Sequence, residues 1–484
     1  MPTICSANAG SVSPSPGETG PVSSSALQLG VSGPINGVMP NLAETIFALS
    51  SAPGRAAIAV SRMSGPAVPE AVRQLAGRLP ASRHAALLSL RDPATAMLLD
   101  QALVLYFEAP HSETGEHIAE FQVHGGRAVI DVVLNALSAI PGCRPAEPGE
   151  FAHRAFINGK LDLTAVEGLA DLIEAETEAQ RRQAVAVAAG QNARLYDGWR
   201  TRLIECQALV ESAIDFSDEA DVSDGAVAAA DERAASLAAE ITDHLSGTVR
   251  GEIIRSGFRV VIAGPTNAGK STLLNALARR DAAIVSAEAG TTRDAIEVHL
   301  DLDGLPVIVT DTAGIRETTG MIEQEGIRRT FDRARVADLV IWLDAPDASA
   351  PVPDNLIADG ADLLKLATKT DLAAAGLGAA TAEPDLRISA ITGDGLDALA
   401  RAIVARARTR LGEGQDLVPI STRQSFHLKQ AAEHLQRYLA DRRLDIELRA
   451  EELRIAADSL GRLTGKIDAE DVLDQIFSRF CIGK

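Results

Sequence analysis

The sequence has few cysteines, few aromatic residues and no long apolar run, and each shortage excludes a class of protein. Its four cysteines, Cys5, Cys143, Cys206 and Cys481, are scattered and form no C-x-x-C pair. This spacing argues against a disulfide framework or a zinc site and fits a reducing cytoplasm. Aromatic residues make up 3% of the chain, too few to predict platforms that stack single-stranded RNA. No run approaches the roughly 18–20 apolar residues of a membrane span, so no membrane association is expected.

Positive charge is also in short supply. Lys and Arg number 46 against 66 Asp and Glu, which gives a formal net charge of −20. Such a chain has no global basic field to draw it onto nucleic acid or an anionic membrane. An RNA contact would therefore need a local basic patch or a basic partner.

The composition of the chain changes along its length, and the changes predict several domains. Residues 1–40 are rich in Ser, Gly and Pro and predict a disordered tail. Residues 41–157 carry strand and helix patterns of an α+β domain. Residues 158–255 and 412–484 have mostly helical spacing, while residues 256–411 alternate strand and helix patterns. We therefore expect an α/β domain inserted in a helical domain, with the α+β domain preceding both.

Within these segments, individual elements are expected from the apolar spacing. Strands are predicted in the first folded segment at residues 45–49, 56–60, 102–107 and 119–124, with a helix at 129–137. Helices are predicted across 161–215, 227–245, 424–439, 446–460 and 469–480.

Eight residues, Gly264 to Ser271, match the phosphate-binding pattern G-x-x-x-x-G-K-[ST]. An apolar run at 258–263 precedes them as a buried strand, and a helical run follows. The glycines let the backbone turn so that successive N–H groups point at phosphate oxygens. Lys270 would reach the β- and γ-phosphates, and the Ser271 hydroxyl could hold Mg²⁺. A chance Gly-rich turn is the alternative, but the strand before and the helix after favour a nucleoside triphosphate site.

Further elements of a nucleotide site follow in a fixed order. Thr292 is placed to complete the Mg²⁺ shell through its hydroxyl. A hairpin is expected over residues 296–310, with its turn at Asp303-Gly304. It leads to Asp311, which would hold Mg²⁺ through water, and to Gly314, whose N–H would contact the γ-phosphate.

The choice of base is indicated by a short segment near residue 370. Thr368-Lys369-Thr370-Asp371 follows a predicted strand at 363–367 and is similar to the Asn-Lys-x-Asp of GTPases. Asp371 would accept hydrogen bonds from guanine N1 and N2. Thr368 replaces the usual Asn, and its hydroxyl could still tether the phosphate loop with one fewer donor. Ser389 and Ala390, after a strand at Leu386, complete the pocket, and these spacings favour GTP over ATP.

The hydrolytic residues depart from the Ras pattern. Ile315 stands where Ras-like enzymes place a water-orienting Gln, and Ile cannot polarise water. Glu323 is a candidate for that role, although a solvated helix carboxylate is an equally simple interpretation. Asn267 could ligate a monovalent cation in place of an arginine finger, or it could merely fill the loop.

From about residue 42 onward the chain resembles the MnmE (also called TrmE) family of tRNA modification GTPases, which are TrmE-Era-EngA-like P-loop GTPases. The resemblance rests on the Asp-Thr-Ala-Gly-Ile run with Glu323 and on the helical blocks at both sides of it. Five short motifs carry it further: Pro53-Gly54-Arg55, Thr114-Gly115-Glu116, His124-Gly125-Gly126, Pro148-Gly149-Glu150-Phe151 and Phe480-Cys481-Ile482-Gly483-Lys484.

The resemblance implies a specific activity. Members form homodimers through the N-terminal domain, which binds a one-carbon tetrahydrofolate (5-formyl- or methylene-tetrahydrofolate). With the flavoprotein MnmG, in a heterotetramer, they add a carboxymethylaminomethyl or aminomethyl group at C5 of the wobble uridine of certain tRNAs. By the family pattern Arg62, Glu120 and Lys160 line the folate site and Lys484 reaches it, although the residues alone would also suit surface charges.

The resemblance also assigns the residues around the nucleotide. The GTPase domains pair across their active sites when potassium is bound, and K⁺ supplies the charge of an arginine finger. Glu323 matches the catalytic carboxylate that orients water. The implied K⁺ ligands are Asn267, Ser286, Glu288 and Thr291, and the implied Mg²⁺ ligands are Ser271 and Thr292. The implied nucleotide contacts are Asn267, Ala268, Gly269, Lys270, Ser271, Thr272, Ser286, Ala287, Glu288, Ala289, Gly290, Thr291, Thr292, Asp311, Thr312, Ala313, Gly314, Thr368, Lys369, Asp371, Ser389 and Ala390.

Two other classes of protein share part of this pattern. A ribosome-assembly or signalling switch GTPase would carry the same nucleotide motifs, often with a basic RNA-binding domain. The flanking segments here are helical and acidic, and they lack a G-X-X-G clamp. A folate-dependent aminomethyltransferase would explain the first domain but not the GTPase motifs.

Overall fold

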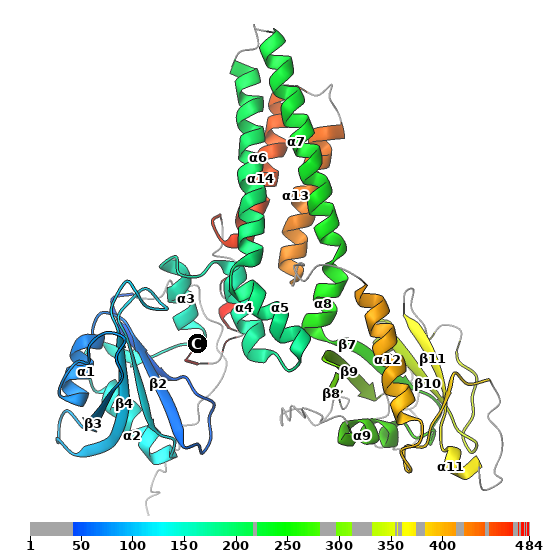
Figure 1. Cartoon of the computed structure of the whole chain (residues 1–484), viewed down its shortest axis with the longest axis horizontal. Coiled ribbons are helices and arrows are strands. Elements are labelled where there is room, and N and C mark those ends of the chain that lie inside the picture. The colour runs from blue at the N-terminus through cyan, green and yellow to red at the C-terminus, as the bar shows by residue number, and fades with distance from the viewer. Residues whose placement is uncertain are drawn as a thin grey trace, which may run out of the picture. The chain divides into compact units, whose positions relative to one another are not determined.

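The computed structural model describes most of the chain (Figure 1). The described residues are 42–215, 220–280, 297–311, 332–353, 356, 361–373, 383–412, 421–440, 445–467, 473, 476–478, 480 and 482–483. The predicted tail, residues 1–40, lies outside them. Among the described helices, none has both the length and the apolar character needed to cross a membrane.

A six-stranded sheet with strand order β3-β4-β5-β2-β1-β6 forms the first folded part. Neighbouring strands are antiparallel except for β6, which runs parallel to β1. The strands are β1 (Thr45–Leu49), β2 (Ile58–Ser64), β3 (Ala86–Arg91), β4 (Leu98–Phe107), β5 (Ile118–His124) and β6 (Cys143–Pro145). Apolar side chains from one face of this sheet share a core with helices α1 (Val68–Ala76) and α2 (Arg127–Ser138). Polar side chains such as Arg62 therefore lie on the opposite face, because side chains alternate along a strand.

The sequence predicted part of this sheet. Three of the four expected strands and the helix α2 lie within a few residues of their predicted positions. The strand expected at 56–60 begins later, at Ile58, and extends to Ser64. Helix α1, strands β3 and β6 and helix α3 (Glu150–Ile157) were not predicted.

Helices that precede residues 256–411 in the sequence pack together with helices that follow them. The core of this group combines α6 (Gln191–Asp215) and α7 (Ala220–Ser246) with α13 (Thr422–Ala440) and α14 (Ile446–Thr464). The four lie side by side as a bundle (Figure 1). The prediction of one helical domain interrupted in sequence is therefore confirmed. Three shorter helices join it: α4 (Leu163–Glu174), α5 (Glu178–Ala188) and α8 (Thr248–Ser256).

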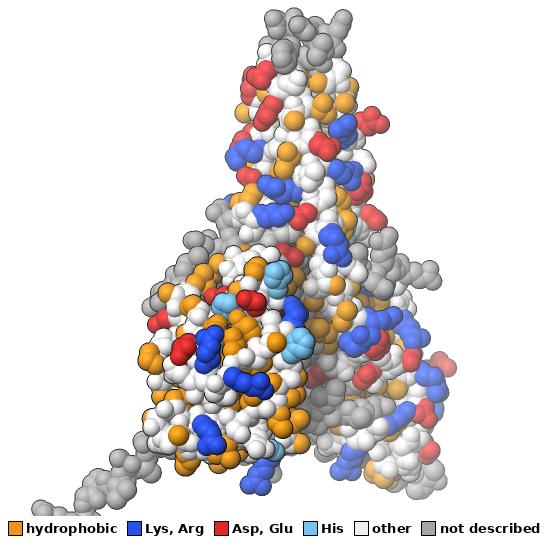
Figure 2. Space-filling model, turned by 60° about the vertical axis from the view of Figure 1, so that its left-hand side comes forward, with side chains coloured by type: hydrophobic (Ala, Val, Ile, Leu, Met, Phe, Trp, Pro, Cys, Tyr) orange, Lys and Arg blue, Asp and Glu red, His pale blue; other side chains and the backbone are white. Residues whose placement is uncertain are grey.

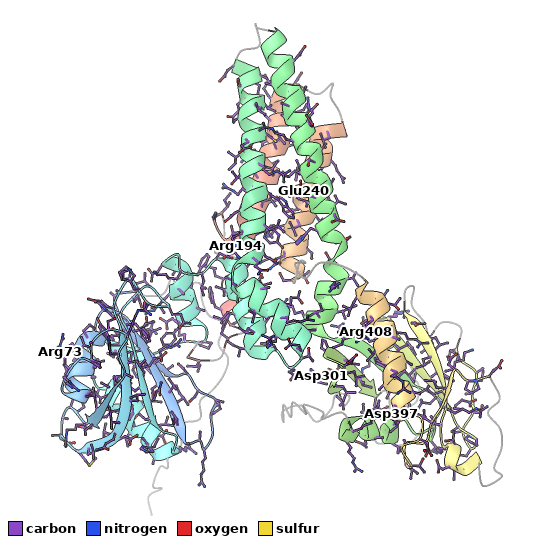
Figure 3. All side chains as sticks on the ribbon, in the orientation of Figure 1. Arg73, Arg194, Glu240, Asp301, Asp397 and Arg408 are labelled. Atoms are coloured by element: carbon purple, nitrogen blue, oxygen red, sulfur yellow. The ribbon has the colours of Figure 1, made fainter. Side chains whose placement is uncertain are left out.

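Polar contacts fix the register of the bundle helices. Glu240 of α7 accepts hydrogen bonds from Arg202 and Trp199 of α6 (Figure 3). Beside them, the ring of His244 stacks edge-on against Trp199 and its Nε2 lies 3.2 Å from the Tyr196 hydroxyl. On the surface, Lys and Arg side chains alternate with Asp and Glu side chains along the helices (Figure 2). Some of these charges form ion pairs one helical turn apart, as Arg454 does with Glu451 and Asp458.

A second six-stranded sheet, with strand order β12-β11-β10-β7-β9-β8, lies between α8 and α13 in the sequence. All neighbours are parallel except β8, which pairs antiparallel with β9. The strands are β7 (Phe258–Ala263), β8 (Glu297–Leu302), β9 (Leu305–Asp311), β10 (Leu339–Asp344), β11 (Asp362–Ala367) and β12 (Leu386–Arg387). Helices α9 (Lys270–Arg280) and α12 (Leu396–Leu411) share a core with this sheet, and α11 (Thr370–Ala373) is a single turn.

The hairpin at one edge of this sheet was predicted. Asp303 and Gly304 have left-handed φ angles of 56° and 79°, as a two-residue turn that follows the twist of a hairpin requires. The hairpin over 296–310 is thus confirmed, and an ion pair between Asp303 and Arg408 connects its turn to α12. Asp397 of α12, labelled in Figure 3, forms an ion pair with Arg280 of α9.

Candidate functional site

The predicted nucleotide residues that the structure describes gather at the carboxyl edge of the second sheet. The phosphate loop follows β7, Asp311 ends β9, and Thr368 to Asp371 follow β11. Ser389 and Ala390 follow β12. Strand β7 has β9 on one side and β10 on the other, so the chain leaves β7 where the strand order reverses. Open α/β sheets bind their ligands at that point.

The backbone of the phosphate loop curls tightly. Gly264 has a φ of 148°, and a Cβ there would lie 2.8 Å from the Leu343 carbonyl oxygen, so only glycine fits. Asn267 and Gly269 also have positive φ angles, of 64° and 95°. Alternating handedness of this kind turns successive N–H groups to one side and makes an anion cradle. The predicted phosphate site is therefore present as a backbone shape.

Lys270 and Thr272 lie on the first turn of α9, directly after the curled backbone. Lys270 Nζ donates to the carbonyl oxygens of Gly264 and Pro265, at 2.9 Å each, so the ammonium group lies over the loop. Thr272 is exposed on the first turn of α9. The lysine that would contact phosphate is thus held in place by the loop's own carbonyl groups.

Ser271 and Asp311 come together although 40 residues separate them. The Ser271 hydroxyl donates to Asp311 Oδ2 at 2.5 Å, and Asp311 is almost fully buried at the end of β9. A hydroxyl oxygen beside a carboxylate is the donor set that Mg²⁺ prefers, with water and phosphate oxygens supplying the other ligands. The residues present fit the predicted ion.

The predicted guanine segment is tied to the phosphate loop and to the next strand. The buried Thr368 donates its hydroxyl hydrogen to the Ala268 carbonyl oxygen at 2.8 Å. Its backbone N–H donates to the Asp344 carbonyl oxygen at 2.8 Å. The buried Ser389 hydroxyl donates to Asp371 Oδ1 at 2.6 Å, which orients the carboxylate predicted to read guanine.

One residue at this edge was missed by the sequence reasoning. Asp347, in the loop after β10, pairs with Lys369 through both carboxylate oxygens, at 2.8 Å and 2.7 Å from Nζ. Lys369 itself has a left-handed φ of 54°. No motif marks Asp347, because its partner lies 22 residues further along the chain.

Several predicted residues cannot be placed. Twelve positions of the nucleotide site and hydrolytic machinery and one of the folate site lie outside the described residues: Ser286, Ala287, Glu288, Ala289, Gly290, Thr291, Thr292, Thr312, Ala313, Gly314, Ile315, Glu323 and Lys484.

A second group of predicted residues meets on the first sheet. Arg62 of β2 stands opposite Glu120 of β5 in the strand register, and Arg62 Nη2 lies 2.9 Å from Glu120 Oε1. Arg62 Nη1 also lies 2.8 Å from Glu113 Oε2, a contact that the sequence did not suggest. Lys160 lies beside the same loop, since a Cβ on Gly115 would be 3.2 Å from Lys160 Cε. Arg62 and Lys160 thus both lie against the loop 113–116, and Glu120 is paired with Arg62.

A buried ionic network supports that loop from behind. The fully buried Arg154 donates to Glu150 Oε1 at 2.9 Å and to both carboxylate oxygens of Glu116 at 3.2 Å. Arg144 adds two further bonds to Glu150, at 2.7 Å and 2.8 Å. Burial alone would raise the pKa of Glu150, but the arginine partners outweigh it and hold that pKa below its usual value. Arg154 therefore joins the sequence motif that contains Glu116 to the one that contains Glu150.

The described residues near the C-terminal end of the chain contact the first sheet. The Ser50 hydroxyl donates to the Gly483 carbonyl oxygen at 3.0 Å, and Ile482 pairs with Pro148 in an isolated β-bridge. Gly483 has a φ of 99°, and a Cβ there would lie 2.3 Å from the Leu49 carbonyl oxygen. These contacts place the residue before Lys484 at the end of β1.

Comparison with known families covers nearly all of the folded chain. The family profile described as MnmE helical domain matches residues 163–481, and the one described as GTP-binding protein TrmE N-terminus matches residues 45–160.

Individual relatives match at about half of all positions. The tRNA modification GTPase MnmE of Parvibaculum lavamentivorans is 50% identical over 91% of this chain and 100% of its own length. The proteins of the same name from Methylorubrum populi and Brucella canis are 51% and 47% identical, over 92% and 91% of this chain and 99% and 98% of their own. Among solved structures, the G domain of the T. maritima FeoB iron transporter is 22% identical over 31% of this chain and 98% of its own, with a TM-score of 0.22, which adds nothing to the topology.

Proposed function

Since the chain belongs to the MnmE family of tRNA modification GTPases, we propose that it adds a carboxymethylaminomethyl or aminomethyl group at C5 of the wobble uridine of certain tRNAs. It is a GTPase with a role in tRNA modification. In the proposed reaction it uses a one-carbon tetrahydrofolate and acts with the flavoprotein MnmG in the cytoplasm. One observation carries this proposal: the described residues of a GTPase edge and the Arg62–Glu120 pair occur on separate sheets of a single chain.

The proposed division of labour follows five segments of the chain. Residues 41–157 would bind folate and dimerise, and residues 256–411 would bind and hydrolyse GTP. Residues 158–255 and 412–484 would form the helical domain between them, and residues 1–40 a tail. The separate apolar cores of the first sheet, the bundle and the second sheet support these boundaries.

At the nucleotide, each residue is assigned by its chemistry. Ser271 and Thr292 would hold Mg²⁺ through their hydroxyl oxygens, and the Ser271–Asp311 bond supports this assignment. Asp371 would accept hydrogen bonds from guanine, with Ser389 fixing its orientation. Glu323 would orient the attacking water, the role that Ile315 cannot fill.

Potassium is proposed as the activating cation. Asn267, Ser286, Glu288 and Thr291 would hold it, and when bound K⁺ supplies the positive charge that an arginine finger gives other GTPases. The position of Asn267 supports this role, because the residue lies in the curled phosphate loop with a left-handed backbone. GTPase domains of two copies would then meet across their nucleotides.

At the first sheet, Arg62, Glu120 and Lys160 would line the folate site, and Lys484 would reach it. A folate carries anionic glutamate carboxylates and a pterin ring with hydrogen-bond donors, so it needs cations and a carboxylate. Arg62 and Lys160 both lie against the loop 113–116, Glu120 pairs with Arg62, and Gly483 contacts the same sheet; these contacts support the assignment.

Nucleoside analysis of tRNA from a deletion strain tests the proposal. We expect the C5 modification of the wobble uridine to disappear and to return with the wild-type gene. Unchanged modification would exclude the proposed function and leave the rival switch GTPase. Two further measurements separate the parts: GTP hydrolysis should depend on potassium and fail in sodium, and the purified protein should bind 5-formyltetrahydrofolate.

A further inference from the structure

We propose that Asp347 positions Lys369 for guanine recognition, so that the methylene stem of this lysine forms a fixed wall of the base pocket. Asp347 does not touch the base in this proposal; it acts through the lysine. The sequence motifs do not include Asp347.

The geometry of the pair is well defined at both ends. Lys369 Nζ lies 2.8 Å and 2.7 Å from the two carboxylate oxygens of Asp347. The lysine side chain is 24% exposed, whereas the aspartate is 52% exposed and lies on the outer side of the pair. The bond from Lys369 is the main cause that lowers the pKa of Asp347.

Backbone contacts hold both partners in place. The loop of Asp347 is closed by two reciprocal bonds between Ala345 and Ala348, at 3.1 Å and 3.0 Å. The backbone on either side of Lys369 is fixed. Thr368 N–H donates to the Asp344 carbonyl oxygen at 2.8 Å, and Thr370 N–H donates to the Ile388 carbonyl oxygen at 3.2 Å. The left-handed conformation of Lys369, unfavourable for a side chain of this kind, persists because these contacts hold it.

The chemistry of lysine explains what such an anchor does. Its stem of four methylene groups is apolar and covers flat apolar surfaces, while the ammonium end stays solvated or paired. A stem that rotates freely loses this freedom when it packs on a base, and the loss weakens binding. An ammonium group already held by Asp347 removes part of that cost before the nucleotide arrives.

Three anchors then fix three parts of the pocket. Thr368 ties the phosphate loop through Ala268, and Ser389 orients the Asp371 carboxylate that would read the base edge. The Asp347–Lys369 pair would fix the base face. A contact with the face of the base does not depend on its exocyclic groups. The pair should therefore strengthen the binding of guanine and hypoxanthine nucleotides by the same factor.

The test compares two aspartates of the same domain. Asp347→Ala removes the anchor, and Asp362→Ala removes a similar exposed pair, with Arg406 at 2.8 Å. We expect Asp347→Ala to raise the Kd for fluorescent mant-GDP and for mant-IDP by the same factor of about two to five, the range for one exposed ion pair. The KM for GTP should rise with it while kcat stays unchanged, and Asp362→Ala should bind as the wild type does.

A double-mutant cycle shows whether Asp347 acts through the lysine. Lys369→Met keeps an apolar stem without the charge, so Asp347→Ala should have no further effect on the Kd in that background. The proposal is overturned if Asp347→Ala leaves the Kd for mant-GDP unchanged. It is equally overturned if the loss persists in the Lys369→Met background, or if GDP and IDP respond differently.

Discussion

The hydroxyl of Thr368 and the carbonyl oxygen of Ala268 are joined by a 2.8 Å hydrogen bond that connects the guanine segment to the phosphate loop. Both residues are buried. A GTPase commonly has Asn in place of Thr368, with two N–H donors, whereas the threonine hydroxyl supplies one. The substitution therefore keeps the tether and reduces its reserve of donors.

We expect Thr368→Val to raise the Kd for mant-GDP about tenfold. Valine has the same shape but leaves the buried Ala268 oxygen without its donor, which costs about 1–3 kcal/mol. Thr368→Asn should bind GDP at least as tightly as the wild type. Fluorescence titration measures both, and a Thr368→Val protein with wild-type affinity would show that the tether does not serve nucleotide binding.

The carboxylate of Glu323 should matter for turnover and not for binding. Glu323→Ala is expected to lower kcat for GTP about 100-fold or more while the Kd for mant-GTP stays unchanged, since the group would act on the attacking water alone. Glu325→Ala, two residues further on, is the matched control and should hydrolyse GTP normally. Loss of nucleotide binding in Glu323→Ala would make the residue structural.

Arg154 should be essential to the stability of the first sheet. Replacing it by Met leaves Glu116 without its cation and the buried Glu150 with Arg144 alone, and breaking a buried ion pair in this way costs about 3–5 kcal/mol. Hydrogen exchange of peptides covering α3 should show the loss, together with a lower unfolding temperature. Arg73, whose ion pair with Glu70 is exposed, is the control (Figure 3). Its replacement by Ala should leave exchange unchanged, and equal effects of the two changes would contradict the prediction.

The helical bundle should lose stability in acid because of His244. Burial lowers the pKa of this residue to about 4, whereas an unfolded histidine titrates near 6.5. Between these values the unfolded chain binds the proton that the folded bundle excludes. The stabilisation is thus complete above pH 6.5 and falls as the pH drops toward 4. From pH 7 to pH 5 the free energy of unfolding should fall by about 2 kcal/mol through this group alone.

The neighbouring Trp199 reports this transition directly. In a Trp342→Phe background, Trp199 is the one remaining tryptophan. Urea unfolding followed by its fluorescence at pH 7 and at pH 5 then gives the difference in the free energy of unfolding. His244→Gln should flatten the pH dependence. If the urea midpoint of the protein that retains His244 is the same at pH 7 and at pH 5, His244 is solvated and the prediction is wrong.

Local signals predicted the parts of the structure that depend on neighbouring residues. The hairpin turn at Asp303-Gly304 and the phosphate loop were found because their backbone shapes need particular residues in sequence. Helix α1, with nine residues, and strand β6, with three, were missed because such short elements depend on the core that they join.

Functional residues that are brought together only by tertiary contacts could not be found from the sequence. Arg62 and Glu120 were named from a resemblance, since nothing in their 58-residue separation reveals that they are opposite each other in the sheet. Glu113, Arg154 and Asp347 were not singled out, because an isolated charged residue is most often a solvated one. Their roles became visible when folding placed a partner beside each.

The bond between Ser50 and Gly483 joins residues that are 433 positions apart. At a synthesis rate of roughly 5–20 residues per second, about 20–90 s separate the appearance of the first from that of the second. During this interval the growing chain exposes the surface around Ser50 and Pro148 with no C-terminal segment to cover it. The first sheet therefore gains these contacts only after the bundle and the second sheet have been synthesised.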